Sequence, residues 1–266
     1  MKAIKELESL NVFSLSESSK RTLRRITISD VSKMEHGNVC LFGFDSENNP
    51  IRPEIPYKGI SKKYIIDGND NQIIHPFSIV EFDFIRSDPQ IPHTEDHIIN
   101  PCFKPVFIRQ IDDHEAEHFL ESILDHDVRS IFGTEIHENR FTKKYQGNRS
   151  IGTVLVKYVQ EISYRRTYSK KNKTNKHHFK IRFVDFSGDE YERPITDCAF
   201  QNYYLNTLKL GINPRTLNDK LKSYFNDHKF FIRIGLGRYY NNGHWLIATG
   251  LYTFPDYKEN LQFTGE

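Results

Sequence analysis

The chain has 266 residues, with 37 lysines and arginines against 35 aspartates and glutamates, so its formal net charge is only +2. This total excludes a globally basic, histone-like protein and an acidic tail protein, and 37% hydrophobic residues with 13% aromatics argue against wholesale disorder. The apolar runs are too short to cross a membrane, residues 1–10 lack the apolar stretch of a signal peptide, and three scattered cysteines indicate reduced thiols. We therefore expect a cytoplasmic protein without a membrane partner.

The composition favours strands over helices. The chain has 28 isoleucines but only 4 alanines, and β-branched residues favour strands whereas alanine is the best helix former. An AT-rich genome would raise the same ratio, so the pattern along the chain decides between the two explanations.

The first half of the chain predicts a leader and a run of strands. Residues 1–20 predict a brief amphipathic helix and a linker, because Ile4, Leu7 and Leu10 lie at helical spacing before a serine cluster. Alternating or compact apolar segments predict the strands Arg24–Ser29, Val39–Phe44, Ile51–Arg52, Phe77–Ile85 and Val106–Ile111.

A helix over Asp112–Leu124 and a polar, irregular stretch up to residue 150 separate this run from a second one. The second run predicts the strands Val154–Tyr164, Phe179–Phe186, Glu190–Arg193, Phe230–Leu236 and His244–Tyr252, with helices over Cys198–Leu210 and Arg215–Phe225. We thus expect a β-domain over 21–111, a connector over 112–150, a second β-domain with inserted helices over 151–255, and a tail over 256–266.

Two hairpins resemble each other and suggest related halves. A strand, a polar turn and an Arg-Pro pair occur in Phe44–Pro53 and again in Asp185–Pro194, and aligning the Arg-Pro pairs aligns Ser46 with Ser187. Together with the similar strand order, this predicts two related small β-domains.

One segment matches the H-E-x-x-H pattern of zinc peptidases. His114 and His118 would share a helix face and bind zinc, with Glu115 as general base. Neighbouring acids crowd the motif and no third ligand stands at a convincing spacing, so we interpret it as a solvated helix start. The strand acids Asp83 and Asp185 leave a metal-dependent nuclease as a further alternative. No cofactor is predicted.

The charge is concentrated in one segment. Lys157–Arg182 holds nine lysines and arginines against one acid, Glu161, and leaves 28 bases against 34 acids in the rest of the chain. Cations bind phosphates and interleaved aromatic rings stack on bases, so the segment predicts nucleic-acid binding, with a merely solvated loop as the alternative. The predicted binding residues are Tyr164, Arg165, Arg166, Tyr168, Lys170, Lys171, Lys173, Lys176 and His177.

A late strand and the turn after it predict further contacts. Alternation places Phe230, Ile232 and Ile234 inward and Phe231 and Arg233 outward. We expect two arginines to hold phosphates and three aromatic residues to offer stacking surfaces; a bent barrel strand with exposed arginines is the alternative. These residues are Arg233, Arg238, Tyr239, Tyr240 and Trp245.

The order of several short motifs resembles the dual-OB-domain family of prokaryotic proteins. The motifs are Arg52-Pro53, Pro76-Phe77-Ser78-Ile79-Val80, Pro92-His93-Thr94-Glu95-Asp96 and Ile234-Gly235-Leu236-Gly237-Arg238. The resemblance spans roughly residues 22–254, although the opening segment Ile28–Lys33 lacks the usual arginine and Asp96 stands where asparagine is commoner. It implies two OB-like barrels, no established catalytic residues, and an accessory role in binding nucleic acid or nucleotides, in a defence system.

Taken together, the residues and the resemblance predict an all-β dominant fold with a few helices, a β-rich α+β protein built from two small OB-like barrels. The predicted function is non-catalytic binding of single-stranded DNA or RNA as an accessory protein. A metal-dependent hydrolase and a protein-interaction adaptor, in which outer aromatics contact a partner protein of the same system, are the alternatives.

Overall fold

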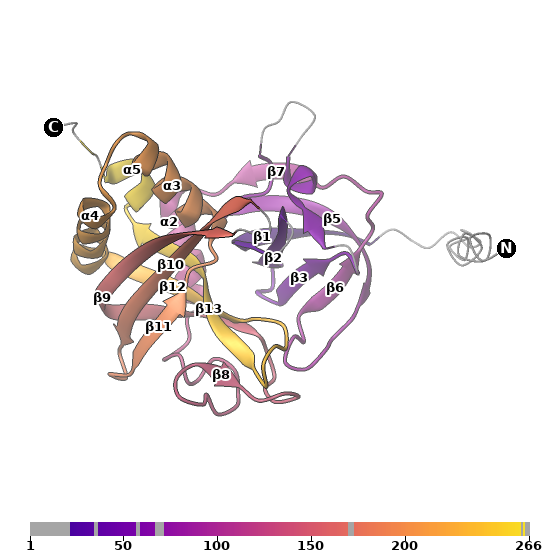
Figure 1. Ribbon diagram of the computed structural model, residues 1–266. Coiled ribbons are helices and arrows are strands. Elements are labelled where there is room, and N and C mark those ends of the chain that lie inside the picture. The colour runs from indigo at the N-terminus through magenta and orange to yellow at the C-terminus, as the bar shows by residue number, and fades with distance from the viewer. Residues whose placement is uncertain are drawn as a thin grey trace.

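The computed structural model describes residues 22–34, 37–56, 59–66, 72–169, 173–261 and 263. The predicted leader over residues 1–20 lies outside them. The described chain is mostly β, as predicted, and its strands form two sheets that lie side by side, with most of the helices gathered over the second (Figure 1). No helix in these ranges is long and apolar enough to cross a membrane.

The first sheet closes into a five-stranded barrel. Its strands are β1 (Thr22–Lys33), β2 (Asn38–Phe44), β3 (Pro50–Glu54), β5 (Ser78–Ser87) and β6 (Asp96–Ile99). They follow the order β1-β2-β3-β6-β5, and β5 pairs back with β1; only the β3–β6 pair is parallel. A small closed barrel of this kind is the one expected of an OB fold. The short strands β4 (Ile60–Ser61) and β7 (Val106–Gln110) add to β2 and β5, and a single 3-10 turn, η2 (Lys62–Ile65), follows β4.

The second sheet repeats this topology. Its strands are β9 (Ile151–Ser169), β10 (Thr174–Asp185), β11 (Glu190–Pro194), β12 (Lys229–Leu236) and β13 (His244–Phe254), with β8 (Phe141–Thr142) added to β13. The order β11-β10-β9-β12-β13 is that of β3-β2-β1-β5-β6. The sheet curls until its ends meet at a parallel bridge between Ile195 and Ala248, where the first barrel has its parallel β3–β6 pair. The expectation of two OB-like barrels is confirmed.

The same turn follows the second strand of each barrel. In the first barrel the Asp45 amide donates to the Asn49 carbonyl, and the Asp45 carboxylate accepts from the Asn49 amide at 2.9 Å. In the second, Asp185 and Asp189 make the same two bonds, and the carboxylate accepts at 3.1 Å. Each aspartate therefore stabilises its turn through hydrogen bonds to the residue four positions further on.

The turns give a second alignment of the two hairpins. Aligning the turns matches Asp45 with Asp185 and Ser46 with Phe186, whereas aligning the Arg-Pro pairs matches Ser46 with Ser187. The two alignments differ because the second hairpin has one more residue between its turn and its Arg-Pro pair. The resemblance itself is supported, because the arginines of both pairs are 6% exposed.

Two of the helices close the second barrel. α3 (Cys198–Lys209) and α4 (Pro214–Asp227) agree with the predicted helices to within a few residues, and Phe200 and Leu217 join the barrel core from them. Asp197 caps α3 by accepting from the amides of residues 199 and 200, and burial raises the pKa of this carboxyl to about 6. A short helix, α5 (Tyr257–Asn260), packs beside them.

The helix α2 (Asp113–Ser122) lies between the barrels. Its Leu120 packs against Phe231 and Tyr252 of the second barrel, and its Phe119 meets Phe44 of the first with ring centroids 5.5 Å apart. The predicted helix is confirmed, and it joins the two halves.

Candidate nucleic-acid interface

The β9–β10 hairpin continues past the second barrel as a two-stranded ribbon, which comprises residues 163–169 and 173–179. β12 pairs with β9 only over residues 151–155, and β11 pairs with β10 only from Lys180 onward. The far end of the ribbon is directed toward the first barrel (Figure 1). Beyond these points no strand among the described residues pairs with either edge of the ribbon.

The register of the ribbon divides the predicted binding residues between its two faces. One face carries Tyr164, Arg166, Tyr168 and His177, because Arg166 pairs with His177 and Tyr164 with Phe179. The other face carries the predicted Arg165 and Lys176, together with His178, which was not predicted. Tyr168 is 60% exposed and free to stack on a base.

The cations of the ribbon have no acidic partners among the described residues. Residues 162–184 contain no aspartate or glutamate. On the barrel itself Lys180 and Arg182 are paired with glutamates of β11, but the ribbon cations make no ion pair with any residue that the structure describes. These cations are Arg165, Arg166, Lys173 and Lys176. The predicted Lys170 and Lys171 lie outside the described residues.

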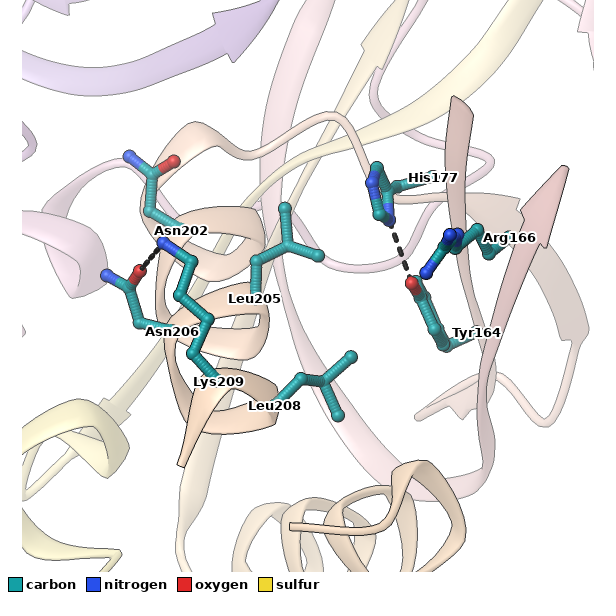
Figure 2. A pocket seen from close by; sticks show the side chains of 8 residues that line it. All are labelled: Tyr164, Arg166, His177, Asn202, Leu205, Asn206, Leu208 and Lys209. Carbon is teal, nitrogen blue, oxygen red and sulfur yellow. Dashed lines mark hydrogen bonds between the residues drawn. The ribbon is translucent and has the colours of Figure 1, made fainter. Parts of the chain in front are cut away.

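A groove of about 350 Å³ lies between the ribbon and α3 (Figure 2). The ribbon lines it with Tyr164, Arg166 and His177, and α3 lines it with Asn202, Leu205, Asn206, Leu208 and Lys209. The sequence predicted the ribbon side of the groove but not the helix side. Its only signal was an exposed Asn-x-x-x-Asn spacing beside two leucines, and nothing in that spacing tells which surface the helix will face.

Tyr164 and His177 form a fixed pair in this groove. Their rings are nearly parallel, at 16° with centroids 5.8 Å apart, and the Tyr164 hydroxyl lies 2.8 Å from His177 Nδ1. Desolvation, together with the charges of Lys33 and Arg166, lowers the pKa of His177. A neutral His177 accepts at Nδ1 from Tyr164, which leaves Nε2–H as a donor.

The second predicted aromatic cluster lies elsewhere. β9 and β12 are antiparallel, so the β12–β13 turn is at the opposite end of the second barrel from the ribbon. There Tyr240 is 68% exposed, and Tyr239 faces Lys144 at 5.0 Å from its ring centroid. Trp245 donates from Nε1 to the Tyr240 carbonyl and packs on Phe141. The structure therefore separates the predicted residues into two groups.

The prediction that Arg233 contacts phosphates is wrong. Its side chain is fully buried: Nε donates to Asp30 at 3.0 Å and Nη1 to Thr153 at 2.6 Å, and the guanidinium lies over the rings of Phe42 and Phe44. Alternation placed Arg233 correctly on the outer face of β12. The first barrel covers that face, so the arginine joins the two barrels and is inaccessible to a ligand.

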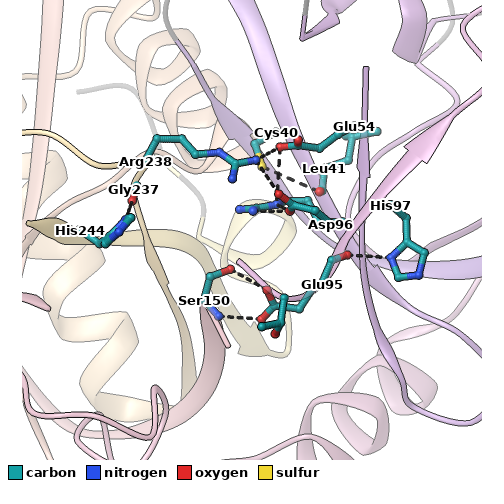
Figure 3. Close-up of polar contacts among 12 residues, drawn as sticks. Cys40, Leu41, Glu54, Glu95, Asp96, His97, Ser150, Gly237, Arg238 and His244 are labelled. Carbon is teal, nitrogen blue, oxygen red and sulfur yellow. Dashed lines mark hydrogen bonds and ion pairs between the residues drawn. The ribbon is translucent and has the colours of Figure 1, made fainter. Parts of the chain in front are cut away.

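Arg238 is also engaged with the first barrel (Figure 3). Its guanidinium contacts Glu54 and lies 2.9 Å from Asp96, whose carboxylate also accepts from Arg52 Nε at 2.5 Å. The side chain of Arg238 remains 44% exposed, but both of its partners are carboxylates. Its positive charge is thus matched within the protein.

Beside this cluster a buried histidine pair lies between the barrels. The rings of His93 and His244 meet edge to face with centroids 5.3 Å apart, and neither nitrogen of His93 has a hydrogen-bond partner among the described residues. Burial, and then the charges of Arg52 and Arg238, lowers the pKa of His93 far below its usual range. Glu95 accepts from the amide and the hydroxyl of Ser150.

In the structure, the glutamate of the H-E-x-x-H motif caps a helix, and both histidines of the motif are exposed. Glu115 completes a capping box with Asp112 at the start of α2 and forms a bidentate pair with Arg109 at 2.7 Å. Those bonds lower the pKa of Glu115 to about 2. His114 and His118 are exposed, and His118 Nδ1 bonds the carbonyl of His114. In the described ranges no three His, Cys, Asp or Glu side chains are grouped to hold a metal ion.

Comparison with known proteins identifies the family. The family model described as the dual OB-containing domain matches residues 24–251. The chain belongs to the dual OB-containing domain family. No curated protein matches. Twelve chains of solved structures match, among them one from "Structure and Conformational Change of a Replication Protein A Heterotrimer Bound to ssDNA". It is 9% identical, the match covers 96% of this chain and 69% of that one, and its TM-score of 0.29 is too low to carry an argument.

In this dual OB-containing domain, segments that carry the family resemblance meet between the barrels. Arg52, His93 and Asp96 come from the first barrel, and Arg238 comes from the end of β12 in the second. In the structure, the contacts of these residues hold one barrel against the other. The ribbon, by contrast, gathers four cations that make no ion pair with any described residue in a segment without acids.

Proposed function

We propose that this protein binds single-stranded nucleic acid along the β9–β10 ribbon without catalysing a reaction on it. The observation that carries the proposal is the acid-free ribbon, whose four described cations make no ion pair with any other described residue. Strand phosphates are the partners that such cations favour, because binding them releases the counterions of the nucleic acid.

The outer face of the first barrel does not offer an equivalent surface. In OB folds the second and third strands commonly present the ligand-binding face. Here Phe42 and Phe44 of β2 lie under Arg233, and Arg52 of β3 is 6% exposed beneath the Arg238 cluster. The second barrel covers that face, so the ribbon and the adjoining groove are the better supported interface.

A comparison of two charge-matched variants tests the proposal. One variant replaces the ribbon cations Arg165, Arg166, Lys173 and Lys176 with glutamine. The control replaces four cations outside the ribbon with glutamine and therefore changes the net charge by the same amount. These four are Lys104, Arg215, Lys220 and Lys222. Fluorescence anisotropy with labelled single-stranded DNA and RNA should show about tenfold or greater weakening for the ribbon variant only. An equal loss of affinity in both variants would show that the attraction is non-specific and that the ribbon is not the binding site.

The family resemblance supports a proposal for the cellular setting. We propose that the protein works in the cytoplasm as an accessory component of a bacterial defence system, with a partner protein of the same system. Genes beside its own that encode no other defence component would contradict this assignment.

A further inference from the structure

The groove beside the ribbon combines an apolar floor with a polar rim. Leu205 and Leu208 point from α3 toward the ribbon, and Tyr164 and His177 stand across from them (Figure 2). At about 350 Å³ the groove is near the small end of the range for ligand sites, so it has room for one ring system rather than several.

The polar groups around that floor are of two kinds. Asn202 and Asn206 are exposed one helical turn apart on α3. The Asn202 amide offers both a donor and an acceptor, whereas Asn206 Oδ1 accepts from Lys209 Nζ at 2.9 Å and its amide nitrogen is the donor that faces a ligand (Figure 2). Arg166 and Lys209 add positive charge, and none of the described residues that line the groove is a carboxylate. The site therefore suits a ligand that is flat and apolar on its faces, hydrogen-bonding at its edge, and attached to negative charge.

A nucleobase in a strand has those three properties together. Its faces stack on aromatic and aliphatic side chains, its edge bonds to amides, and its phosphates pair with neighbouring cations. We propose that the groove between the ribbon and α3 takes one unpaired base of the strand held by the ribbon. This inference rests on the proposed function and deepens it, because a base within a duplex would first have to leave its stack.

Filling the groove tests the inference. Asn206→Trp places a large ring on the exposed rim, and Thr216→Trp, on an exposed position of α4, is the matched control. The probes are a labelled single-stranded DNA and an abasic strand of equal length and charge. The wild type and Thr216→Trp should bind the intact strand about tenfold more tightly than the abasic one, whereas Asn206→Trp should lose most of this preference and keep the wild-type affinity for the abasic strand.

The possible results separate this inference from the proposed function. If the wild type binds the intact and abasic strands equally, the ribbon binds phosphates but the groove takes no base, and the inference fails alone. If Asn206→Trp weakens binding to both strands equally, the groove contacts backbone and the inference also fails. If neither strand binds the wild type, the proposed function fails as well.

A second variant tests the side-chain amides of Asn202 and Asn206 independently. The double change Asn202→Ala with Asn206→Ala removes the edge contacts and leaves the apolar floor. It should lower affinity for the intact strand several-fold and leave affinity for the abasic strand unchanged. An unchanged affinity for the intact strand would show that these amides do not contact the base.

Discussion

The junction between the barrels and the ribbon at the edge of the second barrel use arginine in opposite ways. At the junction Arg233 is fully buried and bonded to Asp30 and Thr153. On the ribbon Arg165 and Arg166 are exposed and unpaired within the described chain. All three lie on alternating β-strands, so the difference comes from what covers each strand.

Strand length produces that difference. β12 is eight residues long and ends within the barrel, where the first barrel covers its outer face. β9 has 19 residues and continues beyond its neighbour β12. An isolated hairpin is marginally stable in water, but Tyr164 and Phe179 anchor this one by packing against Tyr204 of α3. The extra length places cations where no acidic side chain in the described part of the chain pairs with them.

The largest expected effect is at the junction. Arg233→Ala should lower the free energy of unfolding by about 3–5 kcal/mol, because it leaves the Asp30 carboxylate buried without its charged partner. Urea denaturation measures this loss. The double change Asp30→Leu with Arg233→Met should cost less than the two single changes together. A loss below about 1 kcal/mol for Arg233→Ala would remove the contrast with the ribbon.

Acid should weaken the junction through His93. Its pKa in the folded protein is strongly lowered, whereas the unfolded chain protonates it near pH 6.5, so the unfolded state binds more protons below that pH. The contribution of His93 to the free energy of unfolding should fall by about 1.4 kcal/mol per pH unit below about pH 6.5. Urea titrations from about pH 7.5 to about pH 5 should show a shallower pH dependence for His93→Leu than for the wild type; parallel curves would refute the effect.

A substitution at Arg238 tests whether this residue holds the two barrels together or binds phosphate. Arg238→Gln should cost only about 1 kcal/mol, since the side chain is partly exposed and Arg52 remains beside Asp96. Its affinity for single strands should equal that of the wild type. Thermal unfolding and anisotropy measure the two quantities, and a clear loss of affinity in the folded variant would return Arg238 to the binding surface.

The smallest change in stability is expected on the ribbon. Arg165→Ala and Lys176→Ala should each alter the free energy of unfolding by less than about 0.5 kcal/mol, because both side chains are exposed and unpaired within the described residues. Chemical denaturation is the measurement. A larger loss in either variant would show that the ribbon cations support the fold, as those of the junction do.

Alternation predicted much of the fold because most strands have one buried face. β5, β12 and β13 were found in this way, and Phe230, Ile232 and Ile234 do lie in the core. β4 and β8 have two residues each, too few for any periodicity, and β6 follows a proline-rich stretch that hides it. Such short segments become strands only because neighbours offer them an edge.

The candidate site was less predictable, for a related reason. Alternation tells which face a side chain occupies but not whether a second domain covers that face, so Arg233 was placed on the right side with the wrong role. The ribbon was recognisable because the absence of acids is local in sequence. The groove was not, since α3 lies beside Tyr164 only through the closure of the second barrel.

The dependence of single-strand affinity on salt tests the role of the ribbon most directly. With four phosphates held by Arg165, Arg166, Lys173 and Lys176, the logarithm of the binding constant should fall with the logarithm of salt concentration with a slope that includes about −3 from the ribbon. Replacing these four residues with glutamine should make the slope shallower by about 3, and the matched control outside the ribbon should leave it unchanged. Equal slopes for the wild type and the ribbon variant would contradict the assignment of the ribbon as the nucleic-acid interface.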